Sequence, residues 1–248
     1  MSADNDGDVV FIGDVHLQRD DPDVEVFTAF LRAVAPTVAH LVLAGDLFDL
    51  WLASRDLDLP HYRAVLDVLR GLRRGGTVVR YLEGNRDFGV AATFAGDAFD
   101  DATDGGIFES CGGHSIFAIH GDLANPADLR YRAWRAVARS GASWALFRAL
   151  PAAARMRAAE GLERRMRGSN RTFKGAFPEG PVRAYSERFF ARGHDSVVLG
   201  HFHVEKDLTA GSPTAPGRIL VLPEWKGSRR HLRFGRDGSI RFEPSIPG

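Results

Sequence analysis

Five apolar segments of this chain each end beside residues that can bind a metal ion, and this pattern constrains the fold more than any other feature. The segments are residues 9–12, 40–44, 77–82, 115–119 and 196–199. Each is short and rich in β-branched and aliphatic residues, as buried strands are. The residues that follow them are Asp14 and His16, Asp46, Asn85, His120, and His201 and His203. A lone Asp after a strand is usually a turn residue, so it is the repetition that indicates a shared site.

The last of these motifs, Gly200-His201-Phe202-His203, places two histidines one residue apart. Successive side chains on an extended backbone point to opposite sides, so we expect His201 and His203 to point the same way. Two imidazoles at one strand end suggest a metal site. Taken alone, the pair would fit a solvated loop equally well, and the four partner motifs favour the metal site.

Helical periodicity separates the first three predicted strands. Apolar residues recur at helical spacing over residues 24–34, before Pro36, and over residues 61–72, before Gly75-Gly76. Strand–helix–strand order predicts an α/β fold whose strands are parallel and whose helices cover the faces of the sheet. Ligands of such sheets collect at the carboxyl ends of the strands, where the Asp, Asn and His residues lie.

Antiparallel pairs are predicted in the second half of the chain. Residues 107–109 and 115–119 flank a turn with two glycines, and residues 231–234 and 239–242 flank Asp237-Gly238. Residues 218–222 give a further strand. We therefore expect residues 1–248 to form one domain of two packed sheets with helices outside them.

A helical insertion, residues 125–178, interrupts this scheme, and we call it the cap. Asp128 and Ser143 are expected to begin its first two helices, and Gly168 to follow the third. Its 12 basic residues are Arg130, Arg132, Arg135, Arg139, Arg148, Arg155, Arg157, Arg164, Arg165, Arg167, Arg171 and Lys174, and its 3 acidic residues are Asp128, Glu160 and Glu163. The segment is either a solvated helical subdomain or a cap over the metal site. A cap with apolar and cationic sides suits an anionic ligand with acyl chains, or an anionic membrane surface.

The mixture of ligand types indicates the metal and its chemistry. Carboxylate, amide and imidazole ligands together suit Mn²⁺, Fe²⁺ or Zn²⁺ better than Ca²⁺, which takes oxygen ligands. The ligands are too many for one tetrahedral zinc, so we expect two divalent ions, about 3.5 to 4 Å apart and bridged by a carboxylate. Mn²⁺ is our first choice for both. Such a pair binds phosphoryl oxygens and stabilises charge in an in-line displacement.

As a set, the five motifs resemble the signature blocks of the calcineurin-like metallophosphoesterases. The blocks are Asp14-Val15-His16, Gly45-Asp46-Leu47-Phe48-Asp49, Gly84-Asn85-Arg86-Asp87, His120-Gly121-Asp122 and Gly200-His201-Phe202-His203. The resemblance implies a four-layer α/β/β/α sandwich. It implies one metal held by Asp14, His16 and His203, another held by Asn85, His120 and His201, and Asp46 as the bridge. It makes Asp46, Asn85, Arg86 and His120 the expected catalytic residues.

Within that superfamily, three features are similar to the UDP-2,3-diacylglucosamine pyrophosphatases of lipid A synthesis. They are Arg86 where most relatives have His, Trp51 after the second block, and the helical insertion over residues 128–151. The similarity implies hydrolysis of UDP-2,3-diacylglucosamine to UMP and 2,3-diacylglucosamine 1-phosphate, lipid X. It implies substrate contacts from Trp51, Arg86, Asp128, Tyr131, Ser169, Arg171 and Lys174. The alternatives are a dinuclear metallophosphoesterase for another nucleotide sugar, a phosphodiester or a phosphoprotein, and a non-catalytic binding scaffold.

Three further features bear on the location of the protein. Residues 1–8 are polar and acidic, without a secretory signal, and no run reaches the roughly 18 to 20 apolar residues of a membrane-spanning helix. Cys111 is the single cysteine, so no internal disulfide is expected, which fits a reducing compartment. We expect a cytoplasmic enzyme that meets a lipid-linked nucleotide at the cytoplasmic face of the inner membrane. Lys+Arg and Asp+Glu are equal at 32 each, which gives no reason to expect a nucleic-acid partner.

Overall fold

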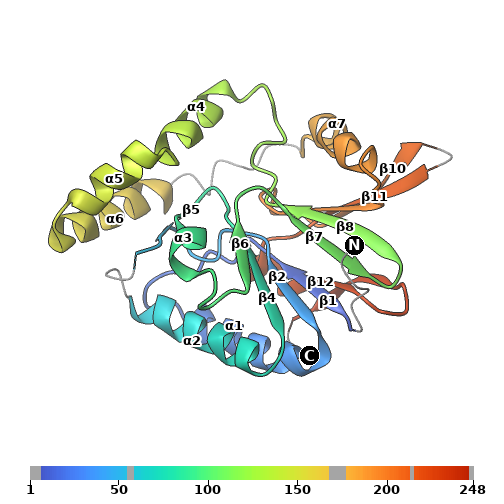
Figure 1. Ribbon diagram of the computed structural model, residues 1–248, viewed down its shortest axis with the longest axis horizontal. Helices are drawn as coiled ribbons and strands as arrows, with labels where there is room; N and C mark the ends of the chain where they lie inside the picture. Colours follow the sequence, from blue (N-terminus) through green and yellow to red (C-terminus); the bar gives the residue numbers. More distant parts are fainter. Residues whose placement is uncertain (1–6, 55–58, 168–176, 213–214, 246–248) are drawn as a thin grey trace.

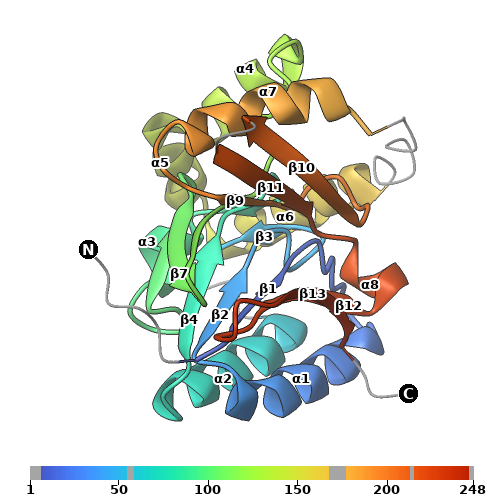
Figure 2. The same cartoon turned by 90° about the vertical axis from the view of Figure 1, so that its right-hand side faces the viewer.

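Two β-sheets lie face to face, with helices over the outer face of each (Figure 1, Figure 2). The structure is a computed structural model, and it describes residues 7–54, 59–167, 177–212 and 215–245. The expected four-layer α/β/β/α sandwich is confirmed. Strands near the centre are apolar on both faces because one face meets the other sheet and the other face meets helices.

The first sheet has the strand order β13-β12-β1-β2-β4-β6. Its strands are β1 (Val9–Ile12), β2 (His40–Leu43), β4 (Val78–Leu82), β6 (Asp101–Thr103), β12 (Arg230–Phe234) and β13 (Ile240–Pro244). The strands β1, β2, β4 and β6 are parallel, and the hairpin of β12 and β13 joins β1 in antiparallel orientation. The three parallel strands predicted from the sequence therefore end at the same edge.

Helices α1 (Asp23–Val34) and α2 (Pro60–Arg74) cover its outer face, and the short helix η1 (Ala35–Thr37) connects α1 to β2. In β1, Val10 and Ile12 pack in the same buried cluster as Phe27 of α1 and Leu69 of α2. Their neighbours on β1 face the second sheet instead. This alternation with a period of two residues is the reason that one short strand serves two cores.

The second sheet has the order β10-β11-β9-β8-β7. Its strands are β7 (Ile107–Cys111), β8 (His114–Ile119), β9 (Ser196–Leu199), β10 (Lys206–Ser212) and β11 (Ala215–Val221). The predicted hairpin of β7 and β8 is present. Helix α7 (Glu179–Phe190) covers the outer face, where Val182 and Phe189 pack with Val197 and Ile219. Parallel β8 and β9 both end at the edge where the first sheet ends its parallel strands.

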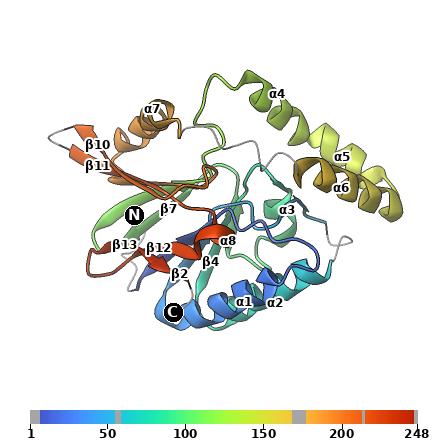
Figure 3. The same cartoon turned by 180° about the vertical axis from the view of Figure 1, so that it is seen from behind.

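Several short elements were not predicted from the sequence. They are the two-stranded sheet of β3 (Trp51–Leu52) and β5 (Asp87–Phe88), helix α3 (Val90–Phe94) and helix α8 (Trp225–Ser228), which is visible from behind in Figure 3. The small sheet joins two of the sequence blocks, because the Trp51 backbone N–H donates to the Arg86 carbonyl at 2.8 Å. Elements of two to five residues carry too little periodicity to be read from sequence.

The described part of the cap holds α4 (Leu129–Ala138), α5 (Gly141–Ala149) and α6 (Ala152–Arg167), which reach beyond the sandwich in Figures 1 and 3. As predicted, the Asp128 carboxylate accepts a hydrogen bond from the Tyr131 backbone N–H at 2.9 Å and begins α4. The prediction that Ser143 begins α5 is wrong. Ser140 does so, accepting from the Ser143 N–H at 3.2 Å, while the Ser143 hydroxyl donates to the Val137 carbonyl.

None of the helices in the described ranges combines the length and the apolar character that crossing a bilayer requires.

Candidate metal centre

Left-handed backbone conformations mark the candidate ligands. Seven non-glycine residues in the described ranges have positive φ, and five of them are Asp14, His16, Asp46, His201 and His203, with φ from 51° to 71°. Such conformations cost about 1 to 3 kcal/mol each and persist where the surroundings fix them. Here backbone hydrogen bonds between blocks fix them: the Asp14 N–H donates to Gly45 and the His16 N–H to Asp46, each at 3.0 Å.

The expectation that His201 and His203 share one direction on extended backbone is wrong. Both have positive φ, so the period of two residues does not apply to them. The ring of His203 points to Asp14 and His16, and the ring of His201 points to Asn85. The motif therefore supplies one imidazole to each of two neighbouring groups of ligands.

The first group, which we call the first subsite, consists of Asp14, His16 and His203. The Nε2 atoms of the two histidines lie 3.1 Å apart, and Asp14 Oδ1 lies 3.4 Å from His203 Nε2 and 4.0 Å from His16 Nε2. Asp14 Oδ2 accepts from the His201 backbone N–H at 2.8 Å, which aims Oδ1 at the two rings. Among the described residues, Asp14 Oδ1 is a buried polar atom without a hydrogen-bond partner.

The second subsite consists of Asn85, His120 and His201. Asn85 Oδ1 lies 3.1 Å from His120 Nε2 and 2.9 Å from His201 Nδ1. His120 Nδ1 donates to the Ala44 carbonyl at 2.8 Å, so the carbonyl fixes the ring and turns Nε2 toward the cleft. Asp46 Oδ2 lies 3.8 Å from that Nε2 atom, while Asp46 Oδ1 accepts from the Arg86 backbone N–H.

Ligand atoms of Asp14, Asp46 and His120 all lie within 4.8 Å of one another, which connects the two subsites. Burial lowers the pKa of His16 well below its usual value and that of His201 to about 4, so both rings are neutral at pH 7. Burial would also lower the pKa of His203, but the Asp14 carboxylate, whose Oδ1 lies 3.4 Å from Nε2, raises it to about 9. Imidazole rings beside buried carboxylates, with His203 giving up its proton on binding, form a donor set that fits two divalent ions.

A cleft of about 240 Å³ opens over this centre. Its lining residues are Asp46, Asn85, Arg86, Gly121, Asp122, Asn125, Asp128, Tyr131, Pro178, His201, Phe202 and His203. The structure thus brings three of the expected substrate contacts, Arg86, Asp128 and Tyr131, to the metal centre. Sequence reasoning missed Asp122 and Asn125 as lining residues. The sequence signal for Asp122 was its place in the His120-Gly121-Asp122 block.

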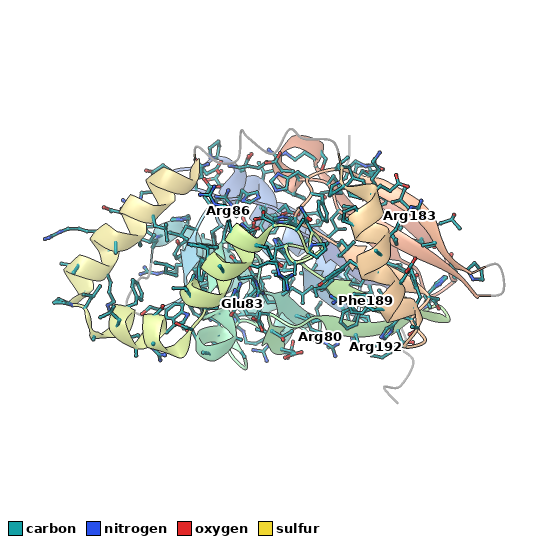
Figure 4. All side chains as sticks on the ribbon, turned by 90° about the horizontal axis from the view of Figure 1, so that it is seen from above. Arg80, Glu83, Arg86, Arg183, Phe189 and Arg192 are labelled. Carbon is teal, nitrogen blue, oxygen red and sulfur yellow. The ribbon has the colours of Figure 1, made fainter. Side chains whose placement is uncertain are left out.

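The Arg86 side chain is buried at the floor of the cleft. Its Nη1 donates to the Asp49 carbonyl at 3.1 Å, and its Nε lies 3.8 Å from Asp46 Oδ2. Asp87, the next residue, accepts at Oδ2 from the backbone N–H groups of Asp46 and Gly84 and from the Tyr81 hydroxyl. Asp87 therefore holds the backbone of the block, and Arg86 presents a cation beside the bridging candidate Asp46. Figure 4 shows Arg86 beside α4 of the cap.

Trp51 does not line the cleft, which corrects the expectation of a substrate contact. Its side chain is 1% exposed and packs in the core, stacked on Phe94 and edge-on to Phe48 and Tyr81. An indole in a row of buried aromatics is a core residue, although its sequence position follows a ligand block. The other expected contacts, Ser169, Arg171 and Lys174, lie outside the described residues.

A second, apolar cavity of about 220 Å³ lies between the cap and the sandwich. It is lined by Leu52, Phe88, Trp134, Ala138, Ser143, Trp144, Phe147, Ala158 and Leu162. The lining combines the small sheet of β3 and β5 with all three cap helices. Its nearly continuous apolar wall contrasts with the charged lining of the metal cleft.

Known proteins resemble this chain over most of its length. The UDP-2,3-diacylglucosamine hydrolase of Stenotrophomonas maltophilia (strain R551-3) is 32% identical over 240 residues, which cover 92% of this chain and 95% of that protein. The protein of the same name from Xanthomonas axonopodis pv. citri is 32% identical over 243 residues, with coverage of 93% and 96%. A solved hypothetical protein of Pyrococcus horikoshii OT3, 11% identical, shares the fold with a TM-score of 0.54 over 96% of this chain and 87% of that one. No protein-family model matches the chain.

Proposed function

The chain belongs to the family of UDP-2,3-diacylglucosamine hydrolases, and from that membership we propose that it cleaves the diphosphate bond of UDP-2,3-diacylglucosamine. The products are UMP and 2,3-diacylglucosamine 1-phosphate. The observation that carries the proposal is the convergence of seven candidate ligands with Arg86 at one cleft. A charged cleft beside an apolar cavity suits a substrate that joins a diphosphate to acyl chains.

In this proposal, Asp14, His16 and His203 hold one divalent ion, and Asn85, His120 and His201 hold the other. Asp46 bridges them, and Mn²⁺ is the first choice of metal, with Fe²⁺ and Zn²⁺ as alternatives. When bound, such a pair of ions neutralises phosphoryl oxygens and lowers the pKa of water. The subsites support this assignment because three nitrogen or oxygen atoms face one another in each.

Arg86 supports cleavage of an anhydride. An arginine stays protonated to a pKa above about 12, so it is a poor proton donor to a leaving group. An alkoxide leaving group would need such a donor, whereas a phosphate monoester leaves without one because its second pKa is about 6. A fixed cation beside Asp46 is suited to neutralising charge on the diphosphate. We therefore assign Arg86 to charge stabilisation, together with substrate positioning by Asp128 and Tyr131.

Residues 125–178 act in this proposal as a cap that recognises the lipid. The apolar cavity between cap and sandwich supplies a water-poor space for at least part of an acyl chain. Each methylene group buried there contributes roughly 0.8 kcal/mol. Trp134, Trp144 and Phe147 give this cavity aromatic surface that a nucleotide does not require.

The outer surface of the cap supports contact with a membrane surface that carries the lipid substrate. Helix α4 turns Tyr131, Arg135 and Arg139 toward the sandwich, at successive helical turns. Two apolar side chains of this helix face outward instead: Leu129 is 71% exposed and Val137 is 66% exposed. Apolar side chains on a basic helix are typical of a helix that lies in a membrane interface.

The proposal is tested with chelator-treated protein to which Mn²⁺ is added. UMP release is followed from UDP-2,3-diacylglucosamine in mixed micelles, and the rival substrates are an alkyl phosphodiester and a phosphoserine peptide. The diacylated substrate is expected to give the highest kcat/KM, and activity should require the metal. A better rival substrate would replace the proposed one. A protein that binds much less than two ions per chain and turns over nothing would be a scaffold.

A further inference from the structure

Arg139, which follows the last residue of α4, contacts one short loop through both of its Nη atoms. Its Nη1 donates to Glu83 Oε2 at 2.5 Å, and its Nη2 donates to the carbonyls of Gly84 at 2.6 Å and Asp87 at 3.0 Å. The side chain is 12% exposed, and its guanidinium lies over the ring of Phe88. Figure 4 shows Glu83 at the side of α4.

The two carbonyls that Arg139 binds belong to the residues on either side of Asn85 and Arg86 in the chain. Residues 84–87 form the loop that carries Asn85, a candidate ligand of the second subsite, and Arg86. The same loop also packs closely on Asp46, because a methyl group at Gly84 would lie 2.2 Å from Asp46 Oδ1. The loop therefore contacts both Asp46 on the sandwich and Arg139 on the cap.

Other polar contacts of α4 with the sandwich differ in kind. One turn earlier, Arg135 Nε donates to Asp122 Oδ2 at 2.8 Å, and the Tyr131 hydroxyl donates to the same carboxylate oxygen. Those contacts join the cap to a side chain. Arg139 binds two backbone carbonyls in addition to the Glu83 carboxylate, so a shift of its guanidinium moves the loop itself.

We propose that Arg139 is a positioning residue that holds Asn85 and Arg86 in register with Asp46, so that the seating of the cap sets the geometry of the second metal subsite. The proposal rests on the proposed function. A planar guanidinium can bind a carboxylate and two carbonyls at once, whereas a lysine offers a single point of charge. Groups that orient metal ligands in this way typically change metal affinity or activity by roughly 10- to 100-fold when they are replaced.

The test uses the full chain with Arg139→Lys, which keeps a cation for the buried Glu83. The matched control is Arg132→Lys, because Arg132 is an exposed arginine on the same helix. Mn²⁺ is titrated into chelator-treated protein without substrate, and free Mn²⁺ is measured by electron paramagnetic resonance. Arg139→Lys is expected to weaken the second equivalent of Mn²⁺ by about tenfold, and Arg132→Lys to match the wild type.

Kinetics then separate positioning of the loop from anchoring of the cap. UDP-glucosamine lacks the acyl chains, so its turnover does not require the apolar cavity. Arg139→Lys should lower kcat on UDP-glucosamine by about tenfold at nearly unchanged KM. A variant with normal Mn²⁺ affinity, whose only defect is a raised KM for the diacylated substrate, would show that Arg139 merely anchors the cap and would overturn the proposal.

If Arg139→Lys does not fold, the double variant Glu83→Gln and Arg139→Gln replaces the buried ion pair with a neutral amide pair. This double variant should also bind the second equivalent of Mn²⁺ more weakly than the wild type does. Wild-type affinity for that equivalent would contradict the proposal. If wild-type protein turns over neither nucleotide sugar, the proposed function fails. The Mn²⁺ titration still decides the role of Arg139 in that case.

Discussion

The Nε2 atoms of His16 and His203 face each other across 3.1 Å, although the two residues are separated by 187 positions in the chain. Asp14 Oδ1 completes the group at 3.4 Å from His203. Two imidazole nitrogens and a buried carboxylate oxygen at this spacing share protons in the metal-free chain, and a divalent cation is a ligand that all three can bind together. Several consequences of this relationship can be measured.

Mn²⁺ should stabilise the folded chain strongly. An ion that binds only the folded state at 100 times its Kd adds about 2.7 kcal/mol to the free energy of unfolding, which corresponds to roughly 5 to 10 °C in Tm for a chain of this size. Thermal unfolding in Mn²⁺ and in chelator measures this difference. His203→Ala should lose most of the increment, while His114→Ala, outside the centre, should keep it. Equal increments in both variants would contradict the first subsite.

Binding of Mn²⁺ should release a proton and strengthen with pH. Without metal, burial would lower the pKa of His203, but the nearby Asp14 carboxylate raises it to about 9, so its ring carries a proton at pH 7.5. The metal needs the neutral ring, so the apparent Kd should fall about tenfold per pH unit up to pH 9 and then level off. Calorimetric titration in buffers of different ionisation enthalpy counts the protons. Affinity that is constant from pH 6.5 to 8.5 would refute the assignment.

Arg86→Ala should slow cleavage of the diphosphate by about 10²- to 10³-fold in kcat, the range for loss of one charge-stabilising donor. The cause is loss of the cation that lies beside Asp46. Steady-state kinetics measure the effect, and Arg130→Ala on the exposed surface of the cap is the control. Arg86→Ala protein that still cleaves the anhydride at the wild-type rate would contradict the role of Arg86 in charge stabilisation. Wild-type protein that cleaves simple alkyl phosphodiesters faster than the anhydride would contradict it too.

Phe147→Ala should discriminate between substrates. Phe147 lines the apolar cavity, and loss of its contacts is expected to reduce kcat/KM for the diacylated substrate by about tenfold, equivalent to roughly 1.4 kcal/mol. The same variant should act on UDP-glucosamine as the wild type does. A parallel loss on both substrates would mean that the cavity does not hold the acyl chains.

The strand ends were predictable from sequence because the signal is local. The run Val9–Ile12 is apolar throughout, the helix that follows it has its own helical periodicity, and the parallel order follows from the alternation of strands and helices. The ligand types at those ends then indicated the site. Even the N-cap of α4, Asp128, was predictable because a side-chain N-cap hydrogen-bonds only to a backbone N–H two or three positions away.

What the sequence could not predict depends on contacts between distant segments. The left-handed backbone of His201 arises with a hydrogen bond from its N–H to Asp14, 187 positions away, and that conformation sends its ring to a different subsite from that of His203. Trp51 looked like a contact residue until its ring was placed among buried aromatics. The hydrogen bonds from Arg139 to the 84–87 loop join residues that lie more than fifty positions apart in the chain.

The identity of the products tests the central claim most directly. Chelator-treated protein is loaded with Mn²⁺ and incubated with UDP-2,3-diacylglucosamine, and the products are identified by mass spectrometry. Cleavage between the two phosphorus atoms predicts UMP and 2,3-diacylglucosamine 1-phosphate in equal amounts. Release of UDP with the free diacylated sugar, or intact substrate at full metal occupancy, would contradict a diphosphate hydrolase built on Asp14, Asp46 and Arg86.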